Sequence, residues 1–130
     1  MPQKADAIFE GGGVKGIGLV GAVSVAESRG YTWVNLAGTS AGAMVAALLA
    51  AGYSSAELKD ALERQDFRDF LDPGLTGSVP VFGPVSNLFS DYGLFKGNAL
   101  ERWMSRLLRA KGVSTFGDLV MDCLLYTSPS

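Results

Sequence analysis

Two glycine-rich turns near the N-terminus constrain the fold more than any other feature of the chain. The first, Gly11-Gly12-Gly13-Val14-Lys15-Gly16, follows a short apolar run at residues 5–9. The second, Gly38-Thr39-Ser40-Ala41-Gly42, follows a run rich in β-branched and aromatic residues at 31–36. Each turn precedes an apolar segment of helical length, so strand, turn and helix occur twice in succession. This order predicts two parallel strands joined by a right-handed crossover.

The segments after these turns have the composition of helices that pack against a sheet. Residues 14–29 carry apolar side chains along their length and end before Gly30, a residue type favoured just after a helix. Residues 41–51 are apolar on every side and end before Gly52, which is typical of a helix buried at the centre of a domain. We therefore predict an α/β fold with a mainly parallel sheet against which helices pack.

Length and composition fit one folded domain and exclude several classes of protein. The chain has 130 residues, is 48% hydrophobic and 18% charged, and so has enough apolar surface for a core. Its net charge of -2 and the absence of a basic run argue against a nucleic-acid partner. The apolar stretch at residues 41–53 is shorter than the about 20 residues of a membrane-spanning helix. The first ten residues lack the apolar run of a signal peptide, so the expected location is cytoplasmic.

The second half of the chain predicts helices separated by a long loop. Ser54-Ser55-Ala56-Glu57 has the pattern of a capping box and predicts a helix that reaches about residue 71. Residues 72–93 are rich in glycine and proline and predict a loop, and Asn98 caps a further helix over residues 100–110. Residues 123–130 end the chain abruptly and are interpreted as a non-native tail, which leaves a domain over residues 5–122.

The second glycine turn has the pattern Gly-x-Ser-x-Gly between a predicted strand and a predicted helix, which is the context of a nucleophile elbow. Gly38 and Gly42 let the backbone turn sharply, so that the hydroxyl of Ser40 is exposed at the apex. The N-terminus of the following helix adds partial positive charge near a developing oxyanion. The alternative is an ordinary strand-to-helix turn in which Ser40 caps the helix.

The first glycine turn suits the binding of an anion. The consecutive glycines Gly11, Gly12 and Gly13 leave their amide N–H groups unshielded, as an oxyanion hole requires. Together with Gly16 they also match the Gly-x-Gly-x-x-Gly fingerprint of dinucleotide-binding proteins. That fingerprint expects an acidic residue about 20 positions later, at the end of the second strand, and residues 30–38 contain none. Dinucleotide binding is therefore the weaker alternative.

The chain contains no histidine, so it cannot form a Ser-His-Asp triad. A nucleophilic serine in this chain would need a different base. With both glycine turns in this order, and with Tyr92-Gly93-Leu94-Phe95-Lys96-Gly97 following them, the sequence resembles the patatin-like phospholipase family over about residues 5–122.

The resemblance implies a three-layer α/β/α fold and a Ser-Asp dyad that hydrolyses acyl esters of lipids. Ser40 matches the nucleophile of the family. The three consecutive glycines match its oxyanion loop, and Lys15 stands where the family carries a basic residue. No metal or organic cofactor is implied. The implied partners are a lipid or other acyl-ester substrate and, transiently, a membrane surface. The sequence carries no sign of the oligomeric state.

One part of the family pattern is missing. The base of the family is the aspartate of a later Asp-Gly-Gly or Asp-Gly-Ala motif, and this chain contains no Asp-Gly pair. We therefore interpret residues 1–130 as the N-terminal part of a longer enzyme and expect the isolated part to be inactive. Two alternatives stay open, a non-catalytic fragment and a dinucleotide-binding module that uses residues 11–16. Labelling of Ser40 by a fluorophosphonate distinguishes the enzyme from both.

Overall fold

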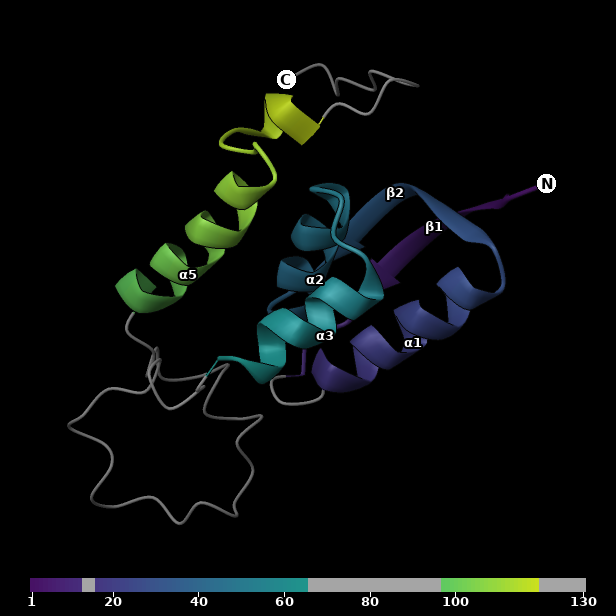
Figure 1. Ribbon diagram of the computed structural model, residues 1–130, viewed down its shortest axis with the longest axis horizontal. Coiled ribbons are helices and arrows are strands. Elements are labelled where there is room, and N and C mark those ends of the chain that lie inside the picture. The colour runs from purple at the N-terminus through teal and green to yellow at the C-terminus, as the bar shows by residue number, and fades with distance from the viewer. Residues whose placement is uncertain (13–15, 66–96, 120–130) are drawn as a thin grey trace, which may run out of the picture.

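The computed structural model describes residues 1–12, 16–65 and 97–119. Strands and helices alternate from β1 to α2, and three further helical segments follow in the described residues (Figure 1). In chain order the elements are β1 (Gln3–Phe9), α1 (Gly16–Ser28), β2 (Tyr31–Gly38), α2 (Ala41–Ala50), α3 (Ser55–Glu63), α5 (Gly97–Ala110) and the short 3-10 helix η4 (Phe116–Leu119).

The two described strands, β1 and β2, pair in parallel, as the sequence predicts. Their register runs from Gln3 opposite Tyr31 to Phe9 opposite Gly38, with a shift between Ala5 and Ala7. The Asp6 carboxylate lies at this shift and accepts hydrogen bonds from the amide N–H and the side-chain NH2 of Asn35, at 3.2 and 2.8 Å. The Asp6 side chain therefore binds the Asn35 amide where the ladder is interrupted, and the strands still end side by side at Phe9 and Gly38.

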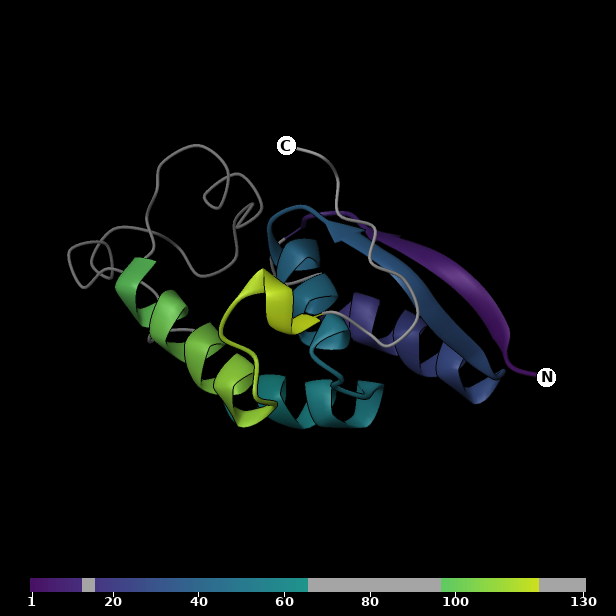
Figure 2. The same cartoon turned by 90° about the horizontal axis from the view of Figure 1, so that it is seen from above.

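Helices α1 and α2 pack on one face of this sheet, and α3 and α5 lie on the same side, against α1 and α2 respectively (Figure 2). Phe9, Trp33 and Leu36 point to that face and contact the core. On the opposite face Ile8 is 85% exposed and Val34 is 48% exposed. The predicted α/β class and parallel pairing are confirmed, and in the described part of the chain the helices cover one of the two faces.

Helix α2 occupies the centre of the molecule, as its all-round apolar sequence predicts. Six of its ten residues are buried, and it contacts both strands as well as α1. Val20 and Val23 of α1 and Leu58 of α3 complete the core around it. The carboxylate of Glu27, near the end of α1, accepts hydrogen bonds from the amide (3.1 Å) and the hydroxyl (2.6 Å) of Ser55, which fixes the start of α3 against α1.

The predicted helix ends are partly confirmed. Gly30 (φ +81°) and Gly52 (φ +95°) follow α1 and α2 in left-handed conformations that glycine adopts without steric cost. The capping box between Ser54 and Glu57 is present at the start of α3.

Two boundaries differ from the prediction. Helix α3 ends at Glu63, short of the predicted end near residue 71, and residues 66–71 lie outside the described residues. Helix α5 begins at Gly97, so Asn98 lies inside its first turn and does not cap it. The predicted loop at residues 72–93 and the tail at 123–130 lie outside the described residues.

Helix α5 is attached to the rest of the molecule through the segment between α2 and α3. The hydroxyl of Tyr53 donates a hydrogen bond to the carbonyl of Leu107 at 2.7 Å. The Lys111 ammonium lies 2.7 Å from the Glu57 carboxylate and 4.7 Å from the centre of the Tyr53 ring. In the described ranges, no helix is both long enough and apolar enough to cross a bilayer.

Candidate active site

The two glycine turns lie at the same edge of the sheet. Because β1 and β2 are parallel and Phe9 is opposite Gly38, the chain leaves both strands at neighbouring points. The two turns are also in contact, since a Cβ atom added to Gly11 would lie 3.0 Å from the Cβ of Ser40. A Cβ on Gly16 would lie 3.7 Å from that of Ala41, so the first residues of α1 and α2 also approach one another.

Ser40 lies at the apex of the turn from β2 to α2 in a conformation that L-residues rarely adopt. Its φ of 51° and ψ of −125° make it the one non-glycine residue with positive φ in the described ranges. It occupies the N-cap position of α2, but its hydroxyl makes no capping hydrogen bond and the residue is exposed. The ordinary capping turn is therefore excluded. A strained, exposed serine between a strand and a helix is the geometry of a nucleophile elbow.

The flanking glycines are required by close contacts between backbones. A Cβ on Gly38 would lie 2.3 Å from the carbonyl oxygen of Gly42. A Cβ on Gly42 would lie 2.3 Å from the carbonyl oxygen of Phe9, which belongs to β1. Because the colliding atoms are backbone, no side-chain movement relieves either clash. The Gly-x-Ser-x-Gly spacing thus lets α2 begin directly against the ends of both strands.

The glycine loop is held against this elbow by hydrogen bonds. The amide of Gly11 donates to the hydroxyl oxygen of Thr39 at 3.0 Å, and the amide of Thr39 donates to the carbonyl of Phe9 at 3.1 Å. Gly12 is half-buried beside them. Gly13 and Lys15, which the sequence also places in this loop, lie outside the described residues.

Comparison with known proteins assigns this arrangement of two glycine turns to a family. The model of the patatin-like phospholipase family matches residues 7–123. The chain belongs to the patatin-like phospholipase family. It is 43% identical over 114 residues to the uncharacterized protein YqhO of Bacillus subtilis (strain 168). That match covers 88% of this chain and 39% of the relative, so the chain spans well under half of the relative's length. No solved structure matches the chain.

The described part of this patatin-like chain provides no base for Ser40, since no described carboxylate forms a hydrogen bond with its hydroxyl. The carboxylates with shifted pKa values lie elsewhere. The Lys111 ammonium, together with the Ser54 amide and hydroxyl, lowers the pKa of Glu57 to about 2. The amides of Ser114 and Thr115 and the Thr115 hydroxyl lower the pKa of Asp118. Asp118 holds a local turn together, whereas Glu57 both caps the start of α3 and pairs with Lys111 beyond the end of α5.

Two members of the site carry no motif signal strong enough for sequence reasoning to assign them a role. The amide of Ala41 is the first of α2 and has no partner inside the helix, whereas those of Gly42 and Ala43 donate to Thr39 and Ser40 carbonyls. In α/β-hydrolases the amide that follows the nucleophile is an oxyanion donor. The second such member is Thr39, at a variable position of the pattern, whose hydroxyl oxygen accepts a hydrogen bond from the Gly11 amide.

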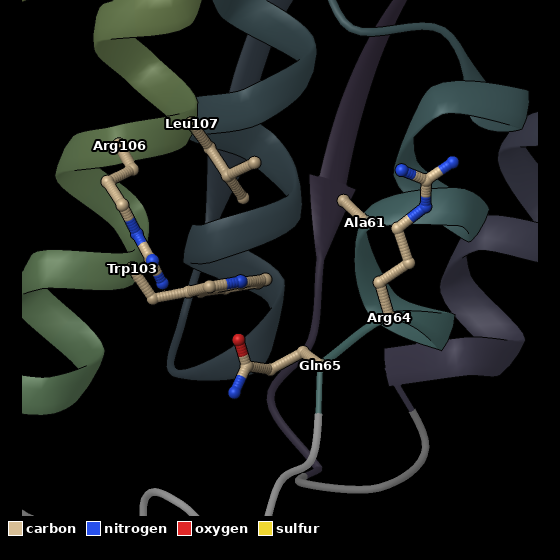
Figure 3. A pocket seen from close by; sticks show the side chains of 6 residues that line it. All are labelled: Ala61, Arg64, Gln65, Trp103, Arg106 and Leu107. Carbon is tan, nitrogen blue, oxygen red and sulfur yellow. The ribbon is translucent and has the colours of Figure 1, made fainter.

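A cavity of about 290 Å³ lies between α3 and α5 and is distinct from the site (Figure 3). The indole of Trp103 and the side chain of Gln65 approach each other at its lower end, and Arg106 borders it on the side of α5. None of its lining residues belongs to the two glycine turns. The cavity is therefore a separate feature of the fold, although the residues that line it lie within the range that the family model matches.

Proposed function

We propose that the protein containing this chain is a serine acyl-ester hydrolase of the patatin-like type, which acts on lipids. The observation that supports it best is the position of Ser40, which is strained, exposed and free of capping bonds beside a glycine loop. A nucleophile needs a free hydroxyl, and the developing oxyanion needs amide donors nearby. Acyl esters of lipids reside in membranes, so we propose transient contact of a cytoplasmic enzyme with a membrane surface.

The mechanism has two halves, with Ser40 as the nucleophile. The Ser40 oxygen attacks the ester carbonyl while its proton passes to an aspartate, and the leaving alcohol departs with that proton to give an acyl-enzyme. Water then attacks the acyl-enzyme and releases the fatty acid, which restores the serine. The oxyanion is held by the amides of Gly12, Gly13 and Ala41. No metal or organic cofactor takes part in either half.

The aspartate of the proposed dyad is not in this sequence, since the chain contains no Asp-Gly pair. We therefore propose that residues 1–130 by themselves do not turn over an ester, and that activity belongs to a protein in which the Asp-Gly motif is also present. The share of the Bacillus relative that the chain matches, 39% of its length, is compatible with this division.

The proposal is tested by Ser40→Ala in the full-length protein, with hydrolysis of a p-nitrophenyl ester as the measurement. We expect a loss of at least about 10³-fold in kcat, as for other serine nucleophiles. Ser24→Ala, at an exposed position of α1, is the matched control and should retain the wild-type rate. A fluorophosphonate should label the wild type and not Ser40→Ala. Undiminished turnover in Ser40→Ala would overturn the proposal, and saturable NAD binding without labelling would favour the dinucleotide alternative.

A further inference from the structure

We infer that Thr39 is a positioning residue, whose hydroxyl fastens the glycine loop to the nucleophile elbow and so fixes the oxyanion donors relative to Ser40. The inference rests on the proposed function and extends it. Thr39 touches neither the substrate nor the reacting atoms in this scheme. Its effect passes through the backbone of Gly11.

The hydrogen bonds of Thr39 join three elements at one point. Its hydroxyl oxygen accepts from the Gly11 amide at 3.0 Å, and its own amide donates to the carbonyl of Phe9, the last residue of β1, at 3.1 Å. Its carbonyl accepts from the amide of Gly42 at 2.9 Å, in the first turn of α2. Of the hydrogen bonds in the described ranges, the one from Gly11 is the direct link between the glycine loop and the elbow.

Packing at Gly11 shows how closely the loop follows the elbow. A Cβ added there would lie 3.0 Å from the Ser40 Cβ, 3.1 Å from the Thr39 carbonyl oxygen and 3.4 Å from the Thr39 hydroxyl oxygen. The loop therefore rests on the backbone of Thr39 and Ser40. A shift of about 1 Å in such a contact is enough to lower a rate about 10²-fold when the loop carries donors to the transition state.

The same hydrogen bond assigns different tasks to the neighbouring glycines. The Gly11 amide already donates to Thr39, so it serves as the anchor of the loop. The amide of Gly12, the next residue, is left available as an oxyanion donor in the proposed scheme. Gly11 and Gly12 are thus predicted to respond differently to substitution, although the two residues are identical and adjacent.

Because Thr39 is exposed, the effect of its substitution on stability can be distinguished from the effect on the rate. Because the residue is exposed, water replaces the lost acceptor in a variant that lacks the hydroxyl, and the effect on stability is small. Water does not hold the loop at a fixed distance from Ser40, so the rate falls while the fold persists. Thr39→Val keeps the shape and removes the acceptor, and Thr39→Ser keeps the acceptor.

The test compares these two variants with the wild type in the full-length protein, with a p-nitrophenyl ester as substrate. Thr39→Val should lower kcat about 10- to 10²-fold with little change in KM, and should slow phosphonylation of Ser40 by a fluorophosphonate to a similar extent. Thr39→Ser should remain within about threefold of the wild type. Thr32→Val is the matched control, since its hydroxyl also bonds a backbone group of the sheet but lies at the opposite end of β2 (3.4 Å to the Gln3 carbonyl).

Several results would overturn the inference. Normal kcat in Thr39→Val would do so and would leave the proposed function intact, as would equal impairment of Thr39→Ser and Thr39→Val. Loss of the folded state in Thr39→Val, measured by its urea midpoint against that of Thr32→Val, would show a structural role instead. A wild-type protein whose turnover does not depend on Ser40 would overturn the proposed function and this inference together.

Discussion

At the scale of single residues, the candidate site contains a backbone conformation that opposes folding. Ser40 has φ 51° and ψ −125°, a region in which a Cβ atom is crowded by the neighbouring backbone. A residue held there costs about 1–3 kcal/mol. The bond from Thr39 to the end of β1 and the tight contact of Gly42 with Phe9 hold the turn in place despite this cost. Under the proposed function, stability and reactivity are therefore opposed at this position.

The opposition predicts that Ser40→Gly is more stable than Ser40→Ala. Both variants lack the hydroxyl and both should be inactive. The glycine adopts positive φ freely, whereas the alanine keeps the strain. After the entropy that glycine gains in the unfolded state is subtracted, we expect a difference of about 1 kcal/mol in the free energy of unfolding in favour of glycine. Urea denaturation of the two variants measures it.

The control for this comparison is the same exchange at an unstrained site. Ala22 is exposed in the middle of α1, where glycine in place of alanine should lower stability by about 0.5–1 kcal/mol. The two exchanges therefore have opposite signs. If Ser40→Gly is less stable than Ser40→Ala, the serine is not strained in solution and the elbow geometry is wrong.

At the scale of elements, α5 is joined to α3 by a small polar cluster whose charge can be titrated. Glu57 accepts from the Lys111 ammonium at 2.7 Å and, on its other oxygen, from the amide (2.8 Å) and hydroxyl (3.0 Å) of Ser54. These bonds lower the pKa of Glu57 from 4.5 to about 2. Since the folded pKa is the lower one, the cluster stabilises the fold fully above about pH 4.5, and its contribution is lost as the pH falls through about 2.

Replacing Lys111 by methionine should raise the pKa of Glu57 toward 4.5 without reaching it, because the hydrogen bonds from Ser54 remain. The measurement is an NMR titration of the Glu57 side-chain carboxyl carbon. Lys59→Met is the matched control, since it removes an ammonium group that lies in α3 near Glu57 but pairs with Glu63, at 3.8 Å. A Glu57 that titrates at the same pH in the wild type and in Lys111→Met would show that α5 is not held through this pair.

Local patterns predicted elements better than they predicted contacts between elements. The apolar runs and glycine turns located both strands, α1 and α2, because each signal lies within a few residues. The end of α3 was missed because no glycine or proline follows Glu63 until residue 73, so the sequence carries no local stop signal there. The bonds Gly11–Thr39 and Tyr53–Leu107 join residues 28 and 54 positions apart. They depend on strand register and helix docking, which a single sequence does not specify.

The site divides in the same way. The sequence was sufficient to propose Ser40 and its flanking glycines as site residues, because a sharp strand-to-helix turn needs those residue types at that spacing. Thr39 was assigned no role of its own, since the Gly-x-Ser-x-Gly pattern accepts any residue type at that position. The positioning role proposed for it rests on the parallel pairing of β1 and β2, which brings Gly11 within hydrogen-bond distance.

At the scale of the whole molecule, the described residues form a sheet covered on one side. Leu48 of α2 is 2% exposed beneath the sheet, whereas Ile8 on the opposite face of β1 is 85% exposed. Because the Leu and Ile side chains have the same number of carbon atoms, substituting each by alanine compares the contributions of the two faces to stability. The free energy of the fold should therefore depend strongly on one face and weakly on the other.

Leu48→Ala should lower the free energy of unfolding of residues 1–130 by about 2–5 kcal/mol, since it removes buried methyl groups and leaves a cavity. Ile8→Ala should change it by no more than about 0.5 kcal/mol, because its side chain is already in contact with solvent. Urea denaturation at several protein concentrations measures both. A cost for Ile8→Ala similar to that for Leu48→Ala would contradict the one-sided arrangement. If that cost rises with protein concentration, the open face is buried between molecules, and if it is constant, the face is covered within one chain.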